Sequence, residues 1–275
     1  MQHEQNKTCN NNFFFLHHMN KFITTALLAV GLTGSAFATT PSDLILGFRD
    51  TSNPANNLEI DLGQASALAG GSGTVTLTNL LSLGSSSINT VYGSGWNTSS
   101  TLLWGVAGTS GTTTTTRTLW ASSVANSSLL DGVATTTAYN GGSVTGQATP
   151  ASKIATVYAG LTAVTSGNVA VLDATGGQSW SVNETPTLAF GKFAIASFEN
   201  NTAITGNYVA SDIYQIAPVS GQAGSYIGTV AIWANGDVTF STIPLAPVPE
   251  PSTYAAILGA AVLGFVIYHR RMVQA

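Results

Sequence analysis

Short runs in which apolar residues recur at every second position fill the chain between residues 39 and 246. This period favours β-strands, because successive side chains of a strand point to opposite faces. Gly, Asn, Ser and Pro separate nearly all of the runs, and these residues favour turns. The predicted strands span residues 43–49, 57–62, 101–107, 115–122, 168–173, 187–197, 207–216 and 226–241. The pattern predicts a mainly β fold, a single β-sandwich-like domain of about 208 residues with one or two short helices.

The first two runs predict an opening hairpin, DLILGFR (residues 43–49) with NLEIDL (residues 57–62), turned at residues 52–54. In the second run, the leucine and isoleucine side chains are expected to face the core. Glu59 and Asp61 alternate with them and are expected to face solvent. They are the only close pair of carboxylates in this part of the chain, and a half-exposed strand explains them without catalysis.

The dipeptide Asn235-Gly236 predicts a second hairpin, because it favours the two positive φ angles of a two-residue type I′ turn. That loop fixes the register of the flanking strands. Four side chains then share one face, which we expect in the core: Ala231, Trp233, Val238 and Phe240. Thr239 and Ser241 are expected to face solvent.

Two segments have helical rather than strand spacing. Residues 150–165 carry apolar side chains at i, i+3, i+4, i+7 and i+10, open with Pro and Ser, and stop before a Ser-Gly pair. This segment predicts a helix. Residues 79–92 have mixed spacing around Gly84, so that a short broken helix and a strand are both compatible with them.

Residues 39–246 contain no histidine and no cysteine. The four histidines are His3, His17, His18 and His269, and the cysteine is Cys9. This absence excludes, for the body of the chain, Ser-His-Asp and Cys-His catalysis, His-ligated zinc or haem, and disulfide bonds. The sequence predicts no catalytic residue, no metal ligand and no cofactor.

The same residues carry four basic side chains, Arg49, Arg117, Lys153 and Lys192, against ten acidic ones. Nucleic-acid binding requires clustered lysine and arginine that neutralise phosphates, so this partner is excluded. A glycosidase needs only two carboxylates, and five tryptophans could stack on sugars. The only close pair of carboxylates, Glu59 and Asp61, has the spacing of a half-exposed strand, so we expect no enzyme here. Tryptophan in a β domain more often packs in the core than binds a ligand.

The N-terminal region predicts export. From Met19, Lys21 precedes an apolar stretch and the small-residue pattern Ala36-Phe37-Ala38, which is typical of a secretory signal peptide over residues 19–38 with cleavage after Ala38. Signal peptidase and the general secretion machinery are then partners. Residues 1–18 match no structural pattern, and are explained either by a start codon assigned too early or by an extended n-region.

The last 29 residues, 247–275, combine three devices. Pro249 and Pro251 disfavour a helix around Glu250, so this peptide is expected to be extended and accessible. Residues 253–268 carry no charge and predict a short transmembrane helix, about 24 Å long. A basic end at residues 269–271 follows, in which Arg270 and Arg271 act as a membrane stop on the cytoplasmic side.

The V-P-E-P sequence, the apolar run and the Arg pair together resemble a PEP-CTERM sorting domain, the tail that bacterial exosortases recognise. The resemblance is confined to residues 248–271. It implies that Pro249, Glu250 and Pro251 are read by an exosortase-like processing enzyme, that the tail is cut nearby, and that the body reaches the cell envelope or beyond.

We therefore expect a precursor that spans the inner membrane once, with its body in the periplasm, and a mature form at the cell surface, in the outer envelope or outside the cell. The expected role is structural or adhesive, with exopolysaccharide as a further partner. The alternative is a secreted carbohydrate-binding or carbohydrate-active protein.

Overall fold

The structure is a computed structural model, and it describes residues 42–113, 115–125, 143–164, 168–184, 198–243 and the single residue 262. The chain divides into two compact units, Met1–Ser35 and Ala36–Ala275. All of the described residues belong to the second unit.

The described residues form ten strands, four short α-helices and two 3₁₀ turns. The strands are β1 (Asp43–Asp50), β2 (Asn56–Gln64), β3 (Thr74–Asn79), β4 (Leu102–Thr109), β5 (Leu119–Val124), β6 (Val169–Asp173), β7 (Asn200–Asn201), β8 (Tyr208–Ile216), β9 (Ser225–Trp233) and β10 (Asp237–Ser241). The helices are α1 (Ala65–Gly70), α2 (Ile88–Tyr92), α3 (Ala148–Val164) and α4 (Trp180–Asn183), and the 3₁₀ turns are η1 (Gly84–Ser86) and η2 (Trp96–Thr98).

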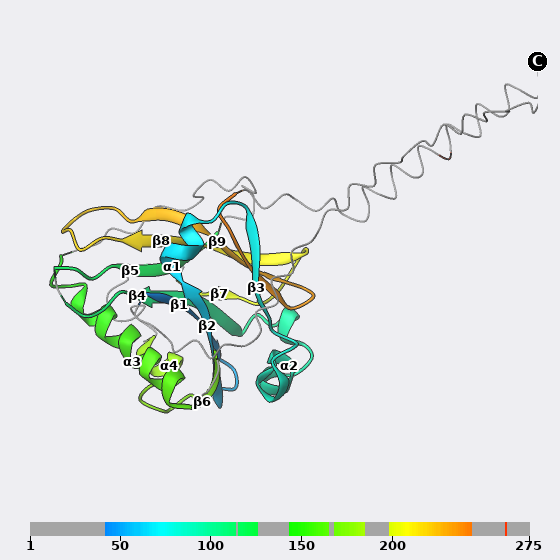
Figure 1. Cartoon of the computed structure of the whole chain (residues 1–275). Coiled ribbons are helices and arrows are strands. Elements are labelled where there is room, and N and C mark those ends of the chain that lie inside the picture. The colour runs from blue at the N-terminus through cyan, green and yellow to red at the C-terminus, as the bar shows by residue number, and fades with distance from the viewer. Residues whose placement is uncertain are drawn as a thin grey trace, which may run out of the picture. The chain divides into compact units, whose positions relative to one another are not determined.

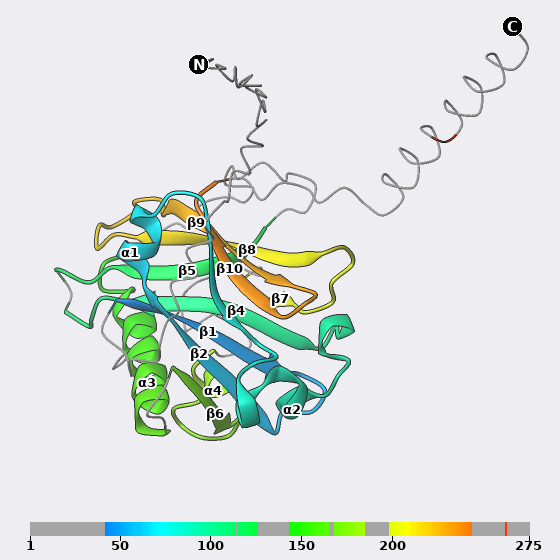
Figure 2. The same cartoon turned by 45° about the vertical axis from the view of Figure 1, so that its right-hand side comes forward.

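The strands form one sheet in the order β3-β10-β9-β8-β5-β4-β1-β2-β6, with β7 added beside β4. Every strand pair is antiparallel. The sheet curls, and the views of Figure 1 and Figure 2 show this curvature. The predicted mainly β fold is confirmed, with four α-helices among the described residues where one or two were predicted. Its sandwich-like packing comes from a single sheet whose β1, β2 and β4 side chains meet those of β9 and β10 in one core.

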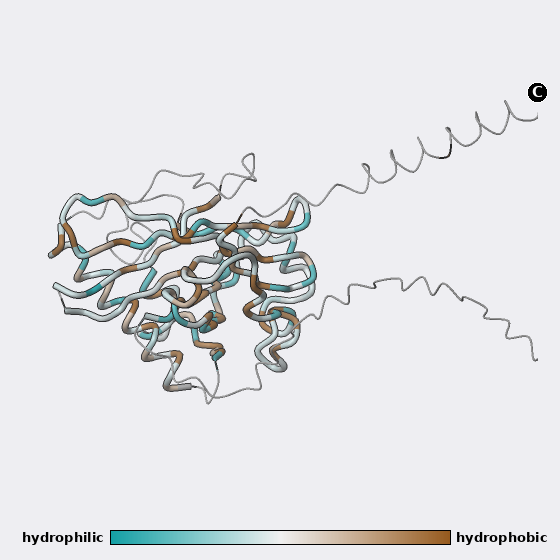
Figure 3. The backbone as a smooth tube through the Cα atoms, turned by 45° about the horizontal axis from the view of Figure 1, so that its top comes forward, coloured by the Kyte–Doolittle hydropathy of each residue, from teal (hydrophilic) through white to brown (hydrophobic). Residues whose placement is uncertain are grey.

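Both faces of the sheet are covered at its centre. The inner face packs leucine, isoleucine, phenylalanine and tryptophan side chains from β1, β2, β4, β9 and β10. The outer face packs against α3, through Ile154, Val157, Tyr158 and Leu161. Figure 3 shows hydrophobic and hydrophilic residues alternating along the strands. Alternate side chains of β1 pack on opposite faces of the sheet: Leu44 and Leu46 lie in the inner core, and Ile45 packs on the outer face with α3.

The predicted opening hairpin is present. β1 and β2 pair antiparallel, with Phe48 opposite Leu58 and Arg49 opposite Asn57. Tyr92 of α2 fixes this pair, since its hydroxyl accepts a hydrogen bond from Leu58 N (3.0 Å) and donates to Phe48 O (3.0 Å). The prediction that Glu59 and Asp61 face solvent is wrong. Their relative exposures are 0% and 7%, because α3 and the segment around α4 cover this face of the sheet.

The second hairpin is present with a different register. Val238 lies opposite Ile232 and Phe240 opposite Val230, so the predicted pairing of Trp233 with Val238 is wrong. The loop has three residues: Gly236 N donates to Trp233 O (2.9 Å), Gly236 has φ +85°, and Asn235 has no positive φ. This is a type I turn followed by a left-handed glycine, the other loop that Asn-Gly favours.

The shift by one residue exchanges the two faces of β9 relative to β10. Val230, Ile232, Val238 and Phe240 pack in the inner core. Ala231 and Trp233 lie on the other face, contrary to the prediction. Thr239 and Ser241 were predicted to face solvent, and they are buried at 6% and 0% exposure.

The helix predicted over residues 150–165 is confirmed as α3, and residues 79–92 form the broken helix of η1 and α2 rather than a strand. The strand predicted over residues 115–122 starts later, at Leu119. The strand predicted over residues 187–197 lies outside the described residues.

Candidate functional site

A polar stripe lies on the buried outer face of β2. Asn57, Glu59 and Asp61 occupy alternate positions of this strand and are exposed by only 0%, 0% and 7%. Two of them hold the start of α4: Glu59 Oε1 accepts a hydrogen bond from Trp180 N (2.6 Å), and Asn57 Oδ1 accepts one from Ser181 N (2.7 Å). These side chains therefore accept backbone N–H groups that the first turn of a helix cannot pair internally.

Two glycines make room for the Trp180 side chain on the sheet. A Cβ atom at Gly47 would lie 2.0 Å from the indole ring, and one at Gly105 would lie 3.3 Å from it. The ring is fully buried, stacks near Phe198 with ring centres 6.1 Å apart, and donates from Nε1 to Glu199 Oε1 (3.0 Å). Glycine at these positions of β1 and β4 lets a tryptophan lie directly on the strand backbones.

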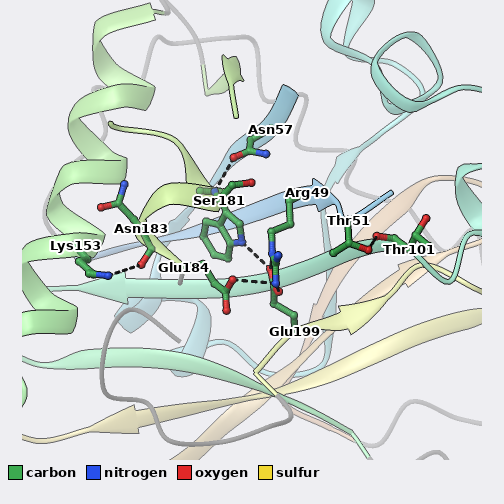
Figure 4. Close-up of polar contacts among 10 residues, drawn as sticks. Arg49, Thr51, Asn57, Thr101, Lys153, Ser181, Asn183, Glu184 and Glu199 are labelled. Carbon is green, nitrogen blue, oxygen red and sulfur yellow. Dashed lines mark hydrogen bonds and ion pairs between the residues drawn. The ribbon is translucent and has the colours of Figure 1, made fainter. Parts of the chain in front are cut away.

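An ion cluster adjoins Trp180 through the hydrogen bond between its indole and Glu199, and Figure 4 shows the side chains of this cluster. We call Arg49, Glu184, Glu199 and Lys153 the Arg49 cluster. Arg49 Nε donates to both carboxylate oxygens of Glu199 (2.9 and 2.8 Å), its terminal nitrogen pairs with the same carboxylate, and that nitrogen lies 3.0 Å from Glu184 Oε2. Lys153 of α3 donates to Asn183 O (3.2 Å). Two of the four basic side chains of residues 39–246 thus meet here.

The protein environment shifts several pKa values in this region. Burial raises the pKa of Glu59 to about 8, against the opposing effect of the Trp180 amide. Burial and the charge of Glu199 raise the pKa of Glu184 to about 7, while Arg49 and Lys153 act in the opposite direction. Burial alone would lower the pKa of Arg49, but the hydrogen bond to Glu199 and the charges of both glutamates raise it.

A second acidic pair lies further along the same face, where Asp61 and Asp43 are both buried. Burial is the main cause that raises the pKa of Asp61 to about 6, and the neighbouring Asp43 acts in the same direction. The hydrogen bond from Gly63 N (2.7 Å) acts in the opposite direction. Tyr158 of α3 lies close to this pair, and its hydroxyl is buried. The pair is a second place where the protein buries carboxyl groups between the sheet and α3.

The Arg49 cluster can hold a proton at Glu184 near neutral pH. Its carboxylates face interior partners, however: Glu199 and Glu184 have side-chain exposures of only 6% and 7%, and Arg49 has 18%. Four of the five tryptophans, Trp96, Trp104, Trp120 and Trp180, are buried, whereas Trp233 is half-buried. Across the described parts of the chain, no group of three or more His, Cys, Asp or Glu side chains is placed to hold a metal ion.

Sequence reasoning did not identify the Arg49 cluster, because its members come from β1, α3 and the segments that flank residues 185–197. The one available signal was the scarcity of basic residues, which makes each of them a candidate partner for a buried carboxylate. The predicted site residues Ala36, Ala38, Pro249, Glu250, Pro251, Arg270 and Arg271 lie outside the described residues.

Within the described segments, no helix has the length and apolar character needed to cross a membrane. The transmembrane helix predicted over residues 253–268 and the signal peptide predicted over residues 19–38 lie outside those segments, except for Val262.

Comparison with known proteins bears on the tail. The model of the PEP-CTERM protein-sorting motif matches residues 247–271, which confirms the resemblance predicted from the V-P-E-P sequence, the apolar run and the Arg pair. The searches of curated proteins and of solved structures gave no match to this chain. The chain therefore carries a PEP-CTERM protein-sorting motif at its C-terminal end, which marks it as an exported substrate of an exosortase.

Proposed function

We propose that the exported β-rich body has a structural or adhesive role in the cell envelope or the extracellular matrix, and that it is not an enzyme. One observation carries this proposal. The carboxylates that a hydrolase would present to a substrate are used inside the fold, because Glu59 holds the Trp180 amide and Glu199 holds both Arg49 and the Trp180 indole.

The Arg49 cluster and Glu59 thus stabilise the packing of α3 and α4 on the sheet. A buried ion pair with satisfied hydrogen bonds fixes one arrangement of the chain, even where it adds little net stability. A rigid body with few charges and many hydroxyl groups suits a matrix component. We infer that the precursor is held in the inner membrane with its body in the periplasm, and that the mature form is released to the surface or the outside.

A second candidate function is binding of exopolysaccharide, which one aromatic pair favours. Trp233 of β9 and Tyr208 of β8 are both half-buried, and their ring centres lie 4.7 Å apart at an interplanar angle of 51°. Trp233 Nε1 donates to Thr239 Oγ1 (2.9 Å), which fixes the indole orientation. A fixed, partly exposed aromatic pair is a surface on which a sugar ring can stack.

The delivery step is tested by expressing the full chain with and without an exosortase. The wild-type precursor should become smaller at its C-terminus and leave the inner membrane only when the enzyme is present. A variant with Glu250→Ala and both Pro249 and Pro251 replaced by Ala should remain anchored. Equal processing of the two chains would contradict the assigned role of this motif.

The role of the body is tested on the released protein. We expect it to sediment with the extracellular matrix and to release no reducing sugar from matrix polysaccharide. If Trp233→Ala abolishes sedimentation with polysaccharide, the binding function is favoured over a purely structural one. Release of reducing sugar that Glu199→Gln abolishes would overturn both proposals in favour of a carbohydrate-active enzyme.

A further inference from the structure

The described body ends at a fixed point on the sheet. β10 pairs with β9 on one side and with β3 on the other. Beyond it, Thr242 N donates to Gly73 O (3.1 Å), the Thr242 hydroxyl donates to Gly71 O (3.2 Å), and the Ser241 hydroxyl donates to Ile243 O (2.6 Å). Ile243, the last described residue of the body, therefore lies next to the start of β3.

The sorting motif follows after a short tether. Five residues, 244–248, separate Ile243 from Pro249. A fully extended chain spans at most about 3.6 Å per residue, so the motif lies no more than roughly 22 Å from Ile243. A domain of about 200 residues has a radius of gyration of roughly 16 Å. An enzyme that binds the motif must therefore approach the surface of the folded body around the point where the chain leaves.

That surface differs from the rest of the body in charge. We call Ser72, Thr74, Val75, Thr76 and Ile243 the exit rim. All five are exposed, and Val75 and Ile243 expose 48% and 49% of their surface. No Asp, Glu, Lys, Arg or His occurs in residues 62–116, which include β3, although the body as a whole has an excess of acidic residues.

The exit rim also lies at an edge of the sheet. β3 is the terminal strand of the order and pairs only with β10 among the described strands. Edge strands of soluble proteins commonly carry charges that discourage contacts with other proteins. β3 has no charge, although a bulge between Thr76 and Thr78 interrupts its pairing with β10. Exposed apolar side chains beside an uncharged edge are suited to contact with a protein surface.

We propose that the exit rim is a docking surface for the membrane-embedded processing enzyme that reads the PEP-CTERM tail. Tether length brings the enzyme to this place, and the rim offers it apolar and hydroxyl groups without charge repulsion. Recognition then has two parts, the motif itself and the adjoining face of the folded body. This inference rests on the sorting motif and is independent of the role proposed for the mature body.

The test compares rates of tail removal for full-length precursors in membranes that contain the enzyme. Val75→Glu and Ile243→Glu, made separately, should each slow removal by more than about fivefold, since burying an unpaired charge in a contact costs at least that much in affinity. The matched control is Val219→Glu. Val219 is equally exposed (50%) and lies between β8 and β9, so this variant should be processed at the wild-type rate.

A longer tether shows whether slow processing of a variant comes from lost docking or from a folding defect. With about 20 Gly-Ser residues inserted after Ile243, the enzyme can reach the motif without touching the body, and Val75→Glu and Ile243→Glu should then be processed at the rate of the inserted parent. Equal rates of Val75→Glu, Ile243→Glu and Val219→Glu in the short-tether chain would overturn the proposal. Failure of the insertion to restore processing would do so as well.

Lipid is the competing partner for the rim. Vesicles of phosphatidylethanolamine and phosphatidylglycerol, mixed with the released wild-type protein, should show no binding that depends on Ile243. Binding that Ile243→Glu abolishes, together with an unchanged rate of tail removal, would assign the rim to the membrane and overturn its assignment to the enzyme.

Discussion

The backbone amide of Trp180 donates a 2.6 Å hydrogen bond to Glu59 Oε1, although the two residues lie 121 positions apart in the chain. Glu59 is fully buried, and its second carboxylate oxygen has no partner among the described residues. Burial therefore disfavours the ionised form, and the pKa of Glu59 rises to about 8. The contact that holds α4 on β2 depends on a carboxyl group that carries a proton at neutral pH.

This contact predicts that the body loses stability as the pH rises. Between about pH 4.5 and 8 the folded state keeps a proton on Glu59 that the unfolded state has lost, so the free energy of unfolding falls through this window. The fall should be on the order of 3 kcal/mol. Asp61 and Glu184, whose pKa values rise to about 6 and about 7, each add a smaller loss in the same direction. Urea unfolding of the released protein at pH 5 and pH 8 measures the difference.

Glu59→Gln, which cannot ionise, should remove the part of that slope that Glu59 contributes, on the order of 3 kcal/mol between pH 5 and 8, while leaving a folded protein. The control is Asp173→Asn, which removes an exposed carboxyl group at the end of β6. That variant should keep the wild-type slope between pH 5 and 8. A Glu59→Gln protein with the wild-type slope would show that Glu59 does not carry the proton.

A methyl group added at Gly47 should displace the Trp180 indole. The new Cβ would lie 2.0 Å from the ring, and the ring is fully buried. We expect Gly47→Ala to cost about 3 kcal/mol of stability and to weaken the near-ultraviolet circular dichroism of tryptophan. Gly70→Ala is the control, because a Cβ at Gly70 meets nothing within 4 Å, and its melting temperature should match the wild type or exceed it slightly.

The recurrence of apolar residues at every second position was sufficient to predict most strands. This pattern depends only on residues close together in the sequence and on one buried face of the sheet. It could not show that the opposite face of β2 is also buried. That outcome depends on α3 and on the segment around α4, which come about 90 and 120 residues later in the chain. Glu59 and Asp61 have the spacing of a solvated face, and only the fold shows that other elements cover them.

The predicted register of the second hairpin was wrong for a different reason. Asn-Gly fits both a two-residue and a three-residue loop, and Phe240 is buried in either register.

The candidate site was less predictable than the fold. Arg49 and Glu199 are 150 positions apart, and nothing in the local pattern of either residue indicates the other. The absence of histidine and cysteine in residues 39–246 excludes the chemistry of those side chains, but it assigns no role to the carboxyl groups that remain. The sorting tail was predictable, because its three devices are consecutive in the sequence and do not depend on tertiary contacts.

Loss of the Tyr92 hydroxyl should loosen the first hairpin. That hydroxyl accepts from Leu58 N and donates to Phe48 O, so it bridges β2 and β1. Tyr92→Phe keeps the ring and should cost about 1–2 kcal/mol, because it leaves both backbone groups without this partner. Urea unfolding gives the loss, and hydrogen exchange should show faster exchange at Leu58 N. Tyr208→Phe is the control, since the half-buried Tyr208 should contribute mainly through its ring. Equal stability of the two variants would argue against the bridge.

Removing the charge of Arg49 should destabilise the body in a pH-dependent way. Arg49→Met leaves Glu184 and Glu199 close together and nearly buried, without the guanidinium that both contact. Because Arg49 keeps 18% side-chain exposure, we expect a loss of about 2 kcal/mol at pH 8, less than for a fully buried pair. The loss should be smaller at pH 5, where Glu184, with its pKa raised to about 7, can take up a proton and relieve the repulsion. Arg49→Met/Glu199→Gln removes both partners of the tightest pair, and it should recover part of the stability at pH 8. A loss for Arg49→Met that is the same at both pH values would mean that packing of its side chain, rather than its charge, matters at this position.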